Sequence, residues 1–118
     1  MHSSSFDFLH FTNPVSWETK NLDYIRSKFY AAYERGNVLT FCWHYYNPVT
    51  GNNFYDTTQV VKHILPGGSH HEVFKGDLKI IADFANNAKN HAGELIPIIF
   101  RPWHEFDGNW FWWGKNHC

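Results

Sequence analysis

The chain has 118 residues and a formal net charge of −1, with 10 Lys and Arg residues against 11 Asp and Glu residues. This balance lacks the basic surplus that gathers phosphates or anionic lipid. No apolar run approaches the roughly 20 residues of a membrane-spanning helix. We therefore predict neither a nucleic acid nor a membrane as partner. The two cysteines, Cys42 and Cys118, define no disulfide framework.

The first half of the chain predicts a strand, a helix and a second strand. Residues 6–10 read as a strand close to the beginning of the chain. Residues 22–32 place apolar side chains three to four positions apart, which is typical of an amphipathic helix, and Gly36 favours its termination. Residues 38–42 are apolar and rich in strand formers, so we expect a strand buried on both faces. It is followed by Trp43 and His44.

A second helix and strand follow a long connection. Residues 45–73 contain interleaved aromatic residues, and we interpret them as a wall of a binding cleft with a short helix over 57–65 capped by Asp56. A helical stripe over 78–88 precedes the apolar run 95–100, which predicts another buried strand with Pro97 near its start. This run leads into Trp103 and His104.

Alternating helices and strands indicate a parallel α/β sheet, in which ligands bind at the C-terminal strand ends. Each of the two predicted strands is followed by a Trp-His pair, so we expect His44 and His104 to converge on one face. A chance recurrence of the pair is the alternative, because the chain contains 9 His and 6 Trp residues.

Residues 101–114, RPWHEFDGNWFWWG, combine charged side chains with aromatic ones and point more directly to a chemical function than any other part of the sequence. We expect indole rings to wall the Glu105 carboxylate, just past a strand, away from water, so that it stays protonated and can act as a general acid. Aromatic faces with polar edges also suit sugar rings. By strand alternation, we expect Trp110 and Trp112 to face one way, and Phe111 and Trp113 the other.

This segment resembles the acid/base region of glycoside hydrolase family 26, in which an Arg-Pro-x-His-Glu strand end is followed by Gly-x-Trp-Phe-Trp-Trp. The resemblance implies a (β/α)8 TIM barrel of retaining enzymes that mostly hydrolyse internal β-1,4-mannosidic bonds. It implies that Glu105 is the acid/base, and that His104, Trp110 and His44 contact the substrate. We also predict that Trp43 and Tyr45 bind the substrate. Arg101 is a further candidate, although we favour a role in holding the catalytic carboxylates over direct contact with the sugar.

The chain departs from the family pattern because no candidate nucleophile Glu follows residue 105 at a later strand. We therefore predict that residues 1–118 are a partial catalytic domain with about three βα units, an exposed sheet edge and negligible hydrolysis alone. By family habit, the whole protein is expected outside the cytoplasm, in the periplasm or the extracellular space.

Several alternatives stay open. Glu105 can instead be a buried carboxylate paired with Arg101, and the two histidines can be core residues. The protein can be a non-catalytic carbohydrate-binding or structural remnant, or a family member that acts on xylan or mixed-linkage β-glucan. His63, His70, His71 and Glu72 lack a metal-ligand spacing, and Asp7 and His10 favour a structural or solvated role. We predict no metal and no cofactor.

Overall fold

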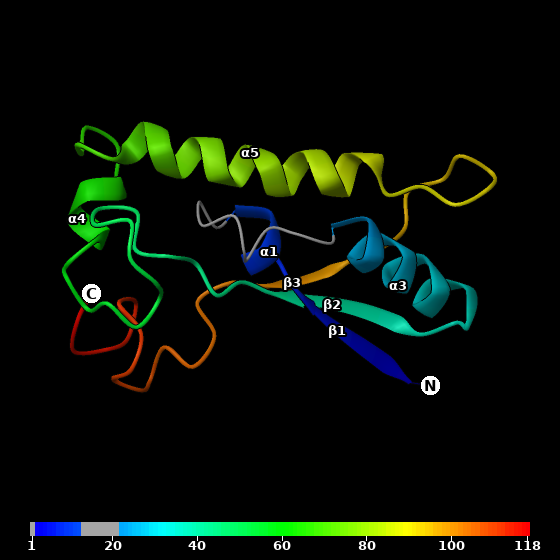
Figure 1. The fold of residues 1–118 in the computed structure, drawn as a ribbon, viewed down its shortest axis with the longest axis horizontal. Coiled ribbons are helices and arrows are strands. Elements are labelled where there is room, and N and C mark those ends of the chain that lie inside the picture. The colour runs from blue at the N-terminus through cyan, green and yellow to red at the C-terminus, as the bar shows by residue number, and fades with distance from the viewer. Residues whose placement is uncertain (1, 13–21) are drawn as a thin grey trace.

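The computed structural model describes residues 2–12 and 22–118. Its elements run in the order β1 (Ser3–Asp7), α1 (Leu9–Thr12), α3 (Leu22–Glu34), β2 (Val38–Cys42), α4 (Val61–Ile64), α5 (His71–Asn87) and β3 (Ile99–Arg101). The three strands form one parallel sheet in the order β1-β2-β3, with α5 running along one side of it (Figure 1). The predicted parallel α/β pattern is confirmed for these residues.

The sheet has one apolar and one polar face, because side chains alternate along each strand. Leu39 and Phe41 of β2 are buried, and Phe41 stacks on Phe8 with ring centroids 4.1 Å apart. Phe29 of α3 and Phe84 of α5 pack on the same ring, at 5.9 and 5.4 Å. This cluster joins both long helices to one face of the sheet.

The opposite face, which we call the polar face, carries Ser5, Asp7, Thr40 and Cys42. Ser5 and Thr40 share a hydrogen bond of 3.1 Å between their hydroxyl oxygens. The register places Asp7 beside Cys42 and Cys42 beside Arg101. A row of chemically active side chains therefore crosses all three strands near their C-terminal ends.

Several predicted boundaries were wrong. Leu9 and His10 belong to α1 and not to the first strand, because the Asp7 carboxylate accepts a hydrogen bond from the Leu9 amide and turns the chain. The short helix α4 begins after Val60 with no side-chain cap. Asp56 instead accepts hydrogen bonds from the amide and hydroxyl of Thr58.

The strand β3 differs from the predicted buried strand. Only Ile99–Arg101 are extended in the sheet, and all three residues are exposed. Pro97 lies before the strand, as expected for a residue that cannot donate to the ladder. β3 pairs with β2 on one side only among the described residues, so the expected exposed sheet edge is present.

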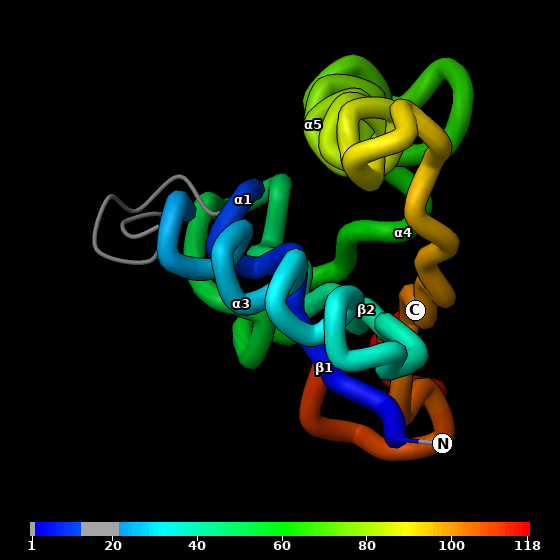
Figure 2. The backbone as a smooth tube through the Cα atoms, turned by 90° about the vertical axis from the view of Figure 1, so that its right-hand side faces the viewer, coloured from blue at the N-terminus to red at the C-terminus, as the bar shows by residue number. Residues whose placement is uncertain are grey.

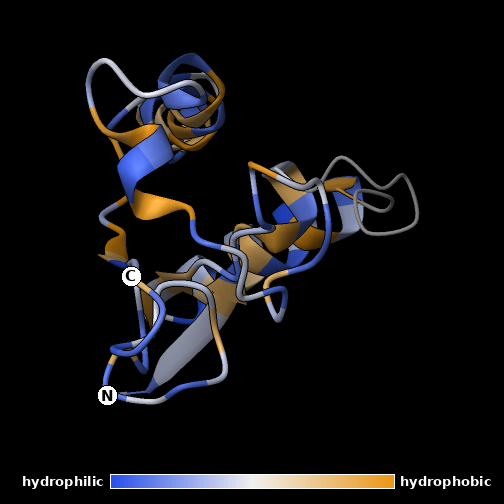
Figure 3. Cartoon of the chain, turned by 90° about the vertical axis from the view of Figure 1, so that its left-hand side faces the viewer, coloured by the Kyte–Doolittle hydropathy of each residue, from blue (hydrophilic) through white to orange (hydrophobic). Residues whose placement is uncertain are grey.

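The predicted helix over 22–32 is confirmed as α3, whereas α5 begins at His71, ahead of the predicted stripe over 78–88. α3 ends at Glu34, and Gly36 has a φ of 81°, the left-handed conformation that closes a helix. Figure 3, in which α5 is seen nearly end-on, shows that this helix carries both hydrophilic and hydrophobic residues. Figure 2 also looks nearly along α5 and shows it above the layer that contains α3 and β1. No helix within residues 2–12 and 22–118 is long and apolar enough to cross a membrane.

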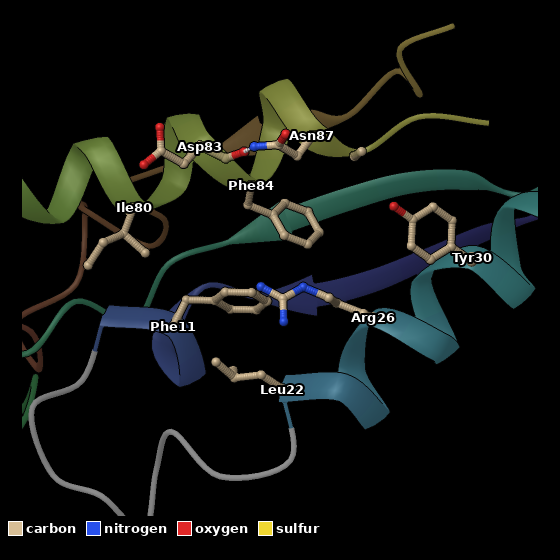
Figure 4. Close-up of a pocket in the computed structure, with 9 residues that line it drawn as sticks. Phe11, Leu22, Arg26, Tyr30, Ile80, Asp83, Phe84 and Asn87 are labelled. Atoms are coloured by element: carbon tan, nitrogen blue, oxygen red, sulfur yellow. Dashed lines mark hydrogen bonds between the residues drawn. The ribbon is translucent and has the colours of Figure 1, made fainter. Parts of the chain in front are cut away.

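A surface pocket of about 300 Å³ opens between α1, α3 and α5 (Figure 4). In it, the Arg26 guanidinium lies 5.6 Å from the centroid of the Phe11 ring. The lining residues come from the helices and not from the ends of the strands. The pocket is thus separate from the polar groups that follow β1, β2 and β3.

Candidate active site at the strand ends

The imidazoles of His44 and His104 meet beyond the ends of β2 and β3. Their Nε2 atoms are 3.2 Å apart, and the ring centroids are 4.4 Å apart. His44 continues the alternation of Cys42 on the polar face, while His104 follows β3 after a tight turn. The predicted convergence of the two Trp-His pairs is confirmed for their histidines.

Asp7 holds His44 in place with both carboxylate oxygens. Oδ1 accepts the His44 backbone N–H at 3.0 Å, and Oδ2 lies 2.5 Å from His44 Nδ1. Burial opposes ionisation of Asp7, but these hydrogen bonds and that from Leu9 outweigh it and lower the Asp7 pKa. Asp7 is therefore an anion whose main partner is the His44 ring.

The two histidines differ in their electrostatic state. The hydrogen bond to Asp7 is the main cause that raises the pKa of His44 to about 10, and Cys42 adds to it while burial works against it. For His104, burial and the neighbouring His44 lower the pKa. His44 is thus the more readily protonated member of the pair, and a proton on its Nε2 can be donated to His104 Nε2. His104 then carries its proton on Nδ1, which is buried with no hydrogen-bond partner among the described residues.

An aromatic wall surrounds the histidine pair. Phe111 lies 5.4 Å from both imidazoles, measured between ring centroids. Phe54, from the long connection after β2, lies 4.8 Å from His44, and Tyr55 stacks on Phe111 at 5.5 Å. The connection is ordered by the buried Asn47, whose amide donates to the carbonyls of Asp56 and Thr58. Phe54 thus brings the connection beside His44, and its role as the wall of a cleft stays a prediction.

Glu105 lies in a strained turn beside Trp110. Both Trp103 and Glu105 have a positive φ, at 57° and 56°, which is uncommon for residues other than glycine. The Trp110 indole N–H donates to Glu105 Oε1 at 3.2 Å, and Gly108 makes room for the Trp110 ring, since a Cβ there would collide with it. The turn therefore presents the carboxylate and the indole together.

Two expectations about this segment were wrong. Glu105 is exposed, so indole rings do not wall its carboxylate away from water within these residues. The alternation over 110–113 also fails, because residues 102–117 form turns and bends and not an extended strand. Trp110 is 47% exposed, whereas Phe111, Trp112 and Trp113 are buried.

The predicted substrate contacts of Trp43 and Tyr45 also disagree with the structure, because both residues lie in the core. Trp43 is 1% exposed, stacks on Tyr45 with centroids 4.0 Å apart, and donates from its indole to Thr12. The Tyr45 hydroxyl donates to the buried Asp77 carboxylate at 2.6 Å. Strand alternation explains their burial, because positions 43 and 45 continue the apolar face of β2.

Arg101 is exposed at the end of β3, and no ion pair joins it to Glu105 in the part of the chain that the structure describes. The alternative of a buried Arg101–Glu105 pair is therefore wrong.

The histidines of residues 63–71 lie near Ser69. His63 and His70 both lie beside the Ser69 hydroxyl, at 3.2 and 2.8 Å, and His71 bonds the Ile64 carbonyl. The sequence favoured a structural or solvated role for Asp7 and gave no sign of its contact with His44, since residues 7 and 44 are distant along the chain.

Histidines and a carboxylate gather beyond the ends of the parallel strands, at the edge where α/β sheets bind their ligands. The sequence model described as Glycosyl hydrolase family 26 matches residues 6–118. The chain belongs to glycoside hydrolase family 26.

Individual relatives agree with this assignment. A mannan endo-1,4-beta-mannosidase of Bifidobacterium adolescentis is 49% identical over 84 residues, which are 71% of this chain and 8% of that protein. The solved structure of GH26C from Muricauda sp. MAR_2010_75 matches with a TM-score of 0.89 and 38% identity, covering 97% of this chain and 34% of that one. A family 26 β-mannanase from Bacteroides ovatus gives a TM-score of 0.84 at 36% identity, with the same coverage. The chain thus spans about a third of these solved relatives.

Proposed function

We propose that the protein carrying this chain is an endo-acting, retaining glycoside hydrolase of β-1,4-linked mannans, built on a (β/α)8 barrel to which these residues contribute about three βα units. The observation that carries the proposal is the meeting of His44 and His104 at 3.2 Å beyond the strand ends, next to the turn that presents Glu105 and Trp110. Membership of family 26 and relatives named as mannan endo-1,4-beta-mannosidases support the substrate class.

In this proposal, Glu105 is the general acid and then the general base. It protonates the glycosidic oxygen of the departing sugar, and it later takes a proton from the water that hydrolyses the glycosyl-enzyme intermediate. A sugar ring stacked on the exposed face of Trp110 would cover the carboxylate and exclude water, which favours the protonated acid. The nucleophile, a second carboxylate about 5–5.5 Å away, is assigned to no described residue.

His44 and His104 supply polar contacts to the sugar hydroxyls in this assignment. Asp7 fixes the His44 ring through Nδ1, so the Nε2 edge faces His104 and the space beside it. Arg101, at the end of β3, counterbalances the negative charge of Glu105 in this assignment. The two charges shift the pKa of His104 in opposite directions, since Glu105 raises it and Arg101 lowers it. Trp43 and Tyr45 are left out of the substrate contacts, since both are buried.

Asp7→Asn tests the positioning of His44. The carboxamide keeps the size of the side chain and loses the charge-assisted hydrogen bond, which is worth about 1.5–3 kcal/mol. We expect kcat/KM of the intact protein on mannan to fall roughly 10- to 100-fold, since each 1.4 kcal/mol is a factor of ten. Asp83→Asn is the matched control, because Asp83 is an exposed carboxylate paired with Lys79 on α5. Equal activity of both variants would count against a role for Asp7.

The substrate class is tested by comparing galactomannan, glucomannan, xylan and mixed-linkage β-glucan with the intact protein. We expect rapid release of internal fragments from the two mannans and at least about tenfold lower kcat/KM on the others, the size of effect that one or two pocket contacts produce. Faster cleavage of xylan or mixed-linkage glucan overturns the mannan assignment. Binding of mannan without new reducing ends would instead identify a non-catalytic carbohydrate-binding protein. We also propose that the intact protein acts outside the cytoplasm, where polysaccharide substrates are found.

A further inference from the structure

One group of potential metal ligands comes together in the described part of the chain. Cys42, His44 and His104 each offer one ligand atom, and these atoms lie within 4.8 Å of one another. All three side chains are partly buried and thus shielded from solvent without being sealed from it. The sequence separates Cys42 from His104 by 62 positions, so the spacing rules applied to the sequence did not detect the group.

We propose that Cys42, His44 and His104 form a binding site for a borderline-soft divalent cation of the zinc class. Thiolate sulfur and imidazole nitrogen are the donors that such ions prefer. The proposal goes beyond glycoside hydrolysis, since cation binding requires no carbohydrate and is measured without it.

The distances fit a tetrahedral ion. Two nitrogens that each lie about 2.0–2.1 Å from one tetrahedral zinc ion are roughly 3.4 Å apart. The two Nε2 atoms of His44 and His104 are 3.2 Å apart, and Cys42 Sγ lies 3.9 Å from His44 Nδ1, the nitrogen that bonds Asp7. The ligand atoms of the three residues lie within 4.8 Å of one another, so movement of the Cys42 side chain toward the two Nε2 atoms completes three ligands and leaves the fourth position open for water.

The surroundings of the ligands resemble those of protein zinc sites. A ligating imidazole normally donates its second N–H to a carboxylate, which fixes the tautomer and the ring orientation. Asp7 accepts from His44 Nδ1 in this way, and the ion takes the place of the proton on Nε2. The Asp7 carboxylate is itself held by the backbone N–H groups of Leu9 and His44, so the second ligand shell is already in place.

The charges around the group balance a divalent ion. A Cys42 thiolate together with the carboxylates of Asp7 and Glu105 supplies three negative charges. Arg101 and the cation supply three positive charges, with both histidines neutral. Arg101 lies next to Cys42 in the sheet register, and its charge opposes cation binding, but Asp7 flanks Cys42 on the other side. Cys42 therefore lies between two charges of opposite sign.

Titration with Co²⁺ and Zn²⁺ tests the site. With the intact, reduced protein, we expect one Co²⁺ per chain with thiolate-to-cobalt charge-transfer absorption and the visible bands of a tetrahedral ion, displaced by Zn²⁺. Cys42→Ser and His104→Gln should each weaken Zn²⁺ binding by at least about tenfold, and Asp7→Asn by about 10- to 100-fold. Cys42→Ala provides a second removal of the thiolate if the serine variant is unstable.

Cys118→Ser is the matched control, since Cys118 is the other free cysteine and is exposed. His70→Gln controls for the histidines near Ser69. Full Zn²⁺ affinity and thiolate absorption should persist in both controls. The proposal is overturned if cobalt shows no thiolate band, if Cys42→Ser and Cys42→Ala bind as tightly as the unmodified protein, or if either control abolishes binding. Both proposals use His44 and His104, but the cation titration contains no sugar, so a failed titration leaves the proposed hydrolysis standing and a failed hydrolysis assay leaves the cation site standing.

Discussion

Under the proposed function, Glu105→Gln is expected to lower kcat for mannan hydrolysis by the intact protein roughly 100- to 10,000-fold, the range that removal of a general acid/base produces. The carboxamide has the size of the carboxyl group and still accepts the hydrogen bond from the Trp110 indole through its oxygen. It can neither protonate the departing oxygen nor accept a proton from water. The measurement is the release of reducing ends at saturating substrate.

Two comparisons make this result specific. Asp107→Asn removes an exposed carboxylate two residues further along the same turn and is expected to keep kcat within about twofold, since surface substitutions are usually worth within ±0.5 kcal/mol. An aryl mannoside with an acidic phenol as leaving group needs no protonation, so Glu105→Gln should lose far less in the first step on that substrate than on mannan. Undiminished mannan hydrolysis by Glu105→Gln would remove Glu105 from the mechanism.

Trp112→Ala lowers the free energy of unfolding by about 3–5 kcal/mol, as expected for loss of a large buried aromatic side chain. The Trp112 side chain is 0% exposed and packs edge-on against Tyr45 and Trp103, with centroids 5.8 and 5.4 Å away. Its indole N–H donates to the Tyr45 carbonyl at 3.0 Å, so the substitution also leaves that buried acceptor unpaired. Urea unfolding of the intact protein, followed by far-UV circular dichroism, measures the change.

Trp110→Ala is the matched control for this stability effect. Trp110 is 47% exposed, so its truncation is expected to cost about 1 kcal/mol or less. Under the proposed function, the same variant loses affinity for mannan, because the exposed indole face is the one offered to a sugar. Similar destabilisation by the two variants would contradict the separation of Trp110 from Trp112 in the fold.

The sequence was sufficient for the local elements and the family. The helix over 22–34, the strand over 38–42 and the left-handed residue at Gly36 follow from apolar periodicity and turn chemistry, which are properties of neighbouring residues. Segment 101–114 was enough to identify family 26, since its residue types and spacing are read directly from the chain. The meeting of His44 and His104 followed from one rule, that parallel strands end at the same edge.

The same local rules failed wherever long-range packing decided the outcome. The run 95–100 was expected to be buried, but β3 contributes only three exposed residues, because burial depends on what covers a strand and not on its composition. Trp43 and Tyr45 were expected to face a ligand because they adjoin His44. The alternation of β2 turns them into the core, where they meet Thr12 and Asp77.

The sequence by itself therefore determined most of the elements and the family, and it pointed to the residues that are proposed to carry acid, base and aromatic chemistry. Only the tertiary structure decided which of these side chains meet. It separated Trp110 from Trp112 through the turns after β3, and it brought Asp7 and Cys42 to the two histidines. The physical reason is that hydrogen bonds and shared ligand sites depend on distance in space, and residues 7, 42 and 104 become neighbours only when three parallel strands align in register.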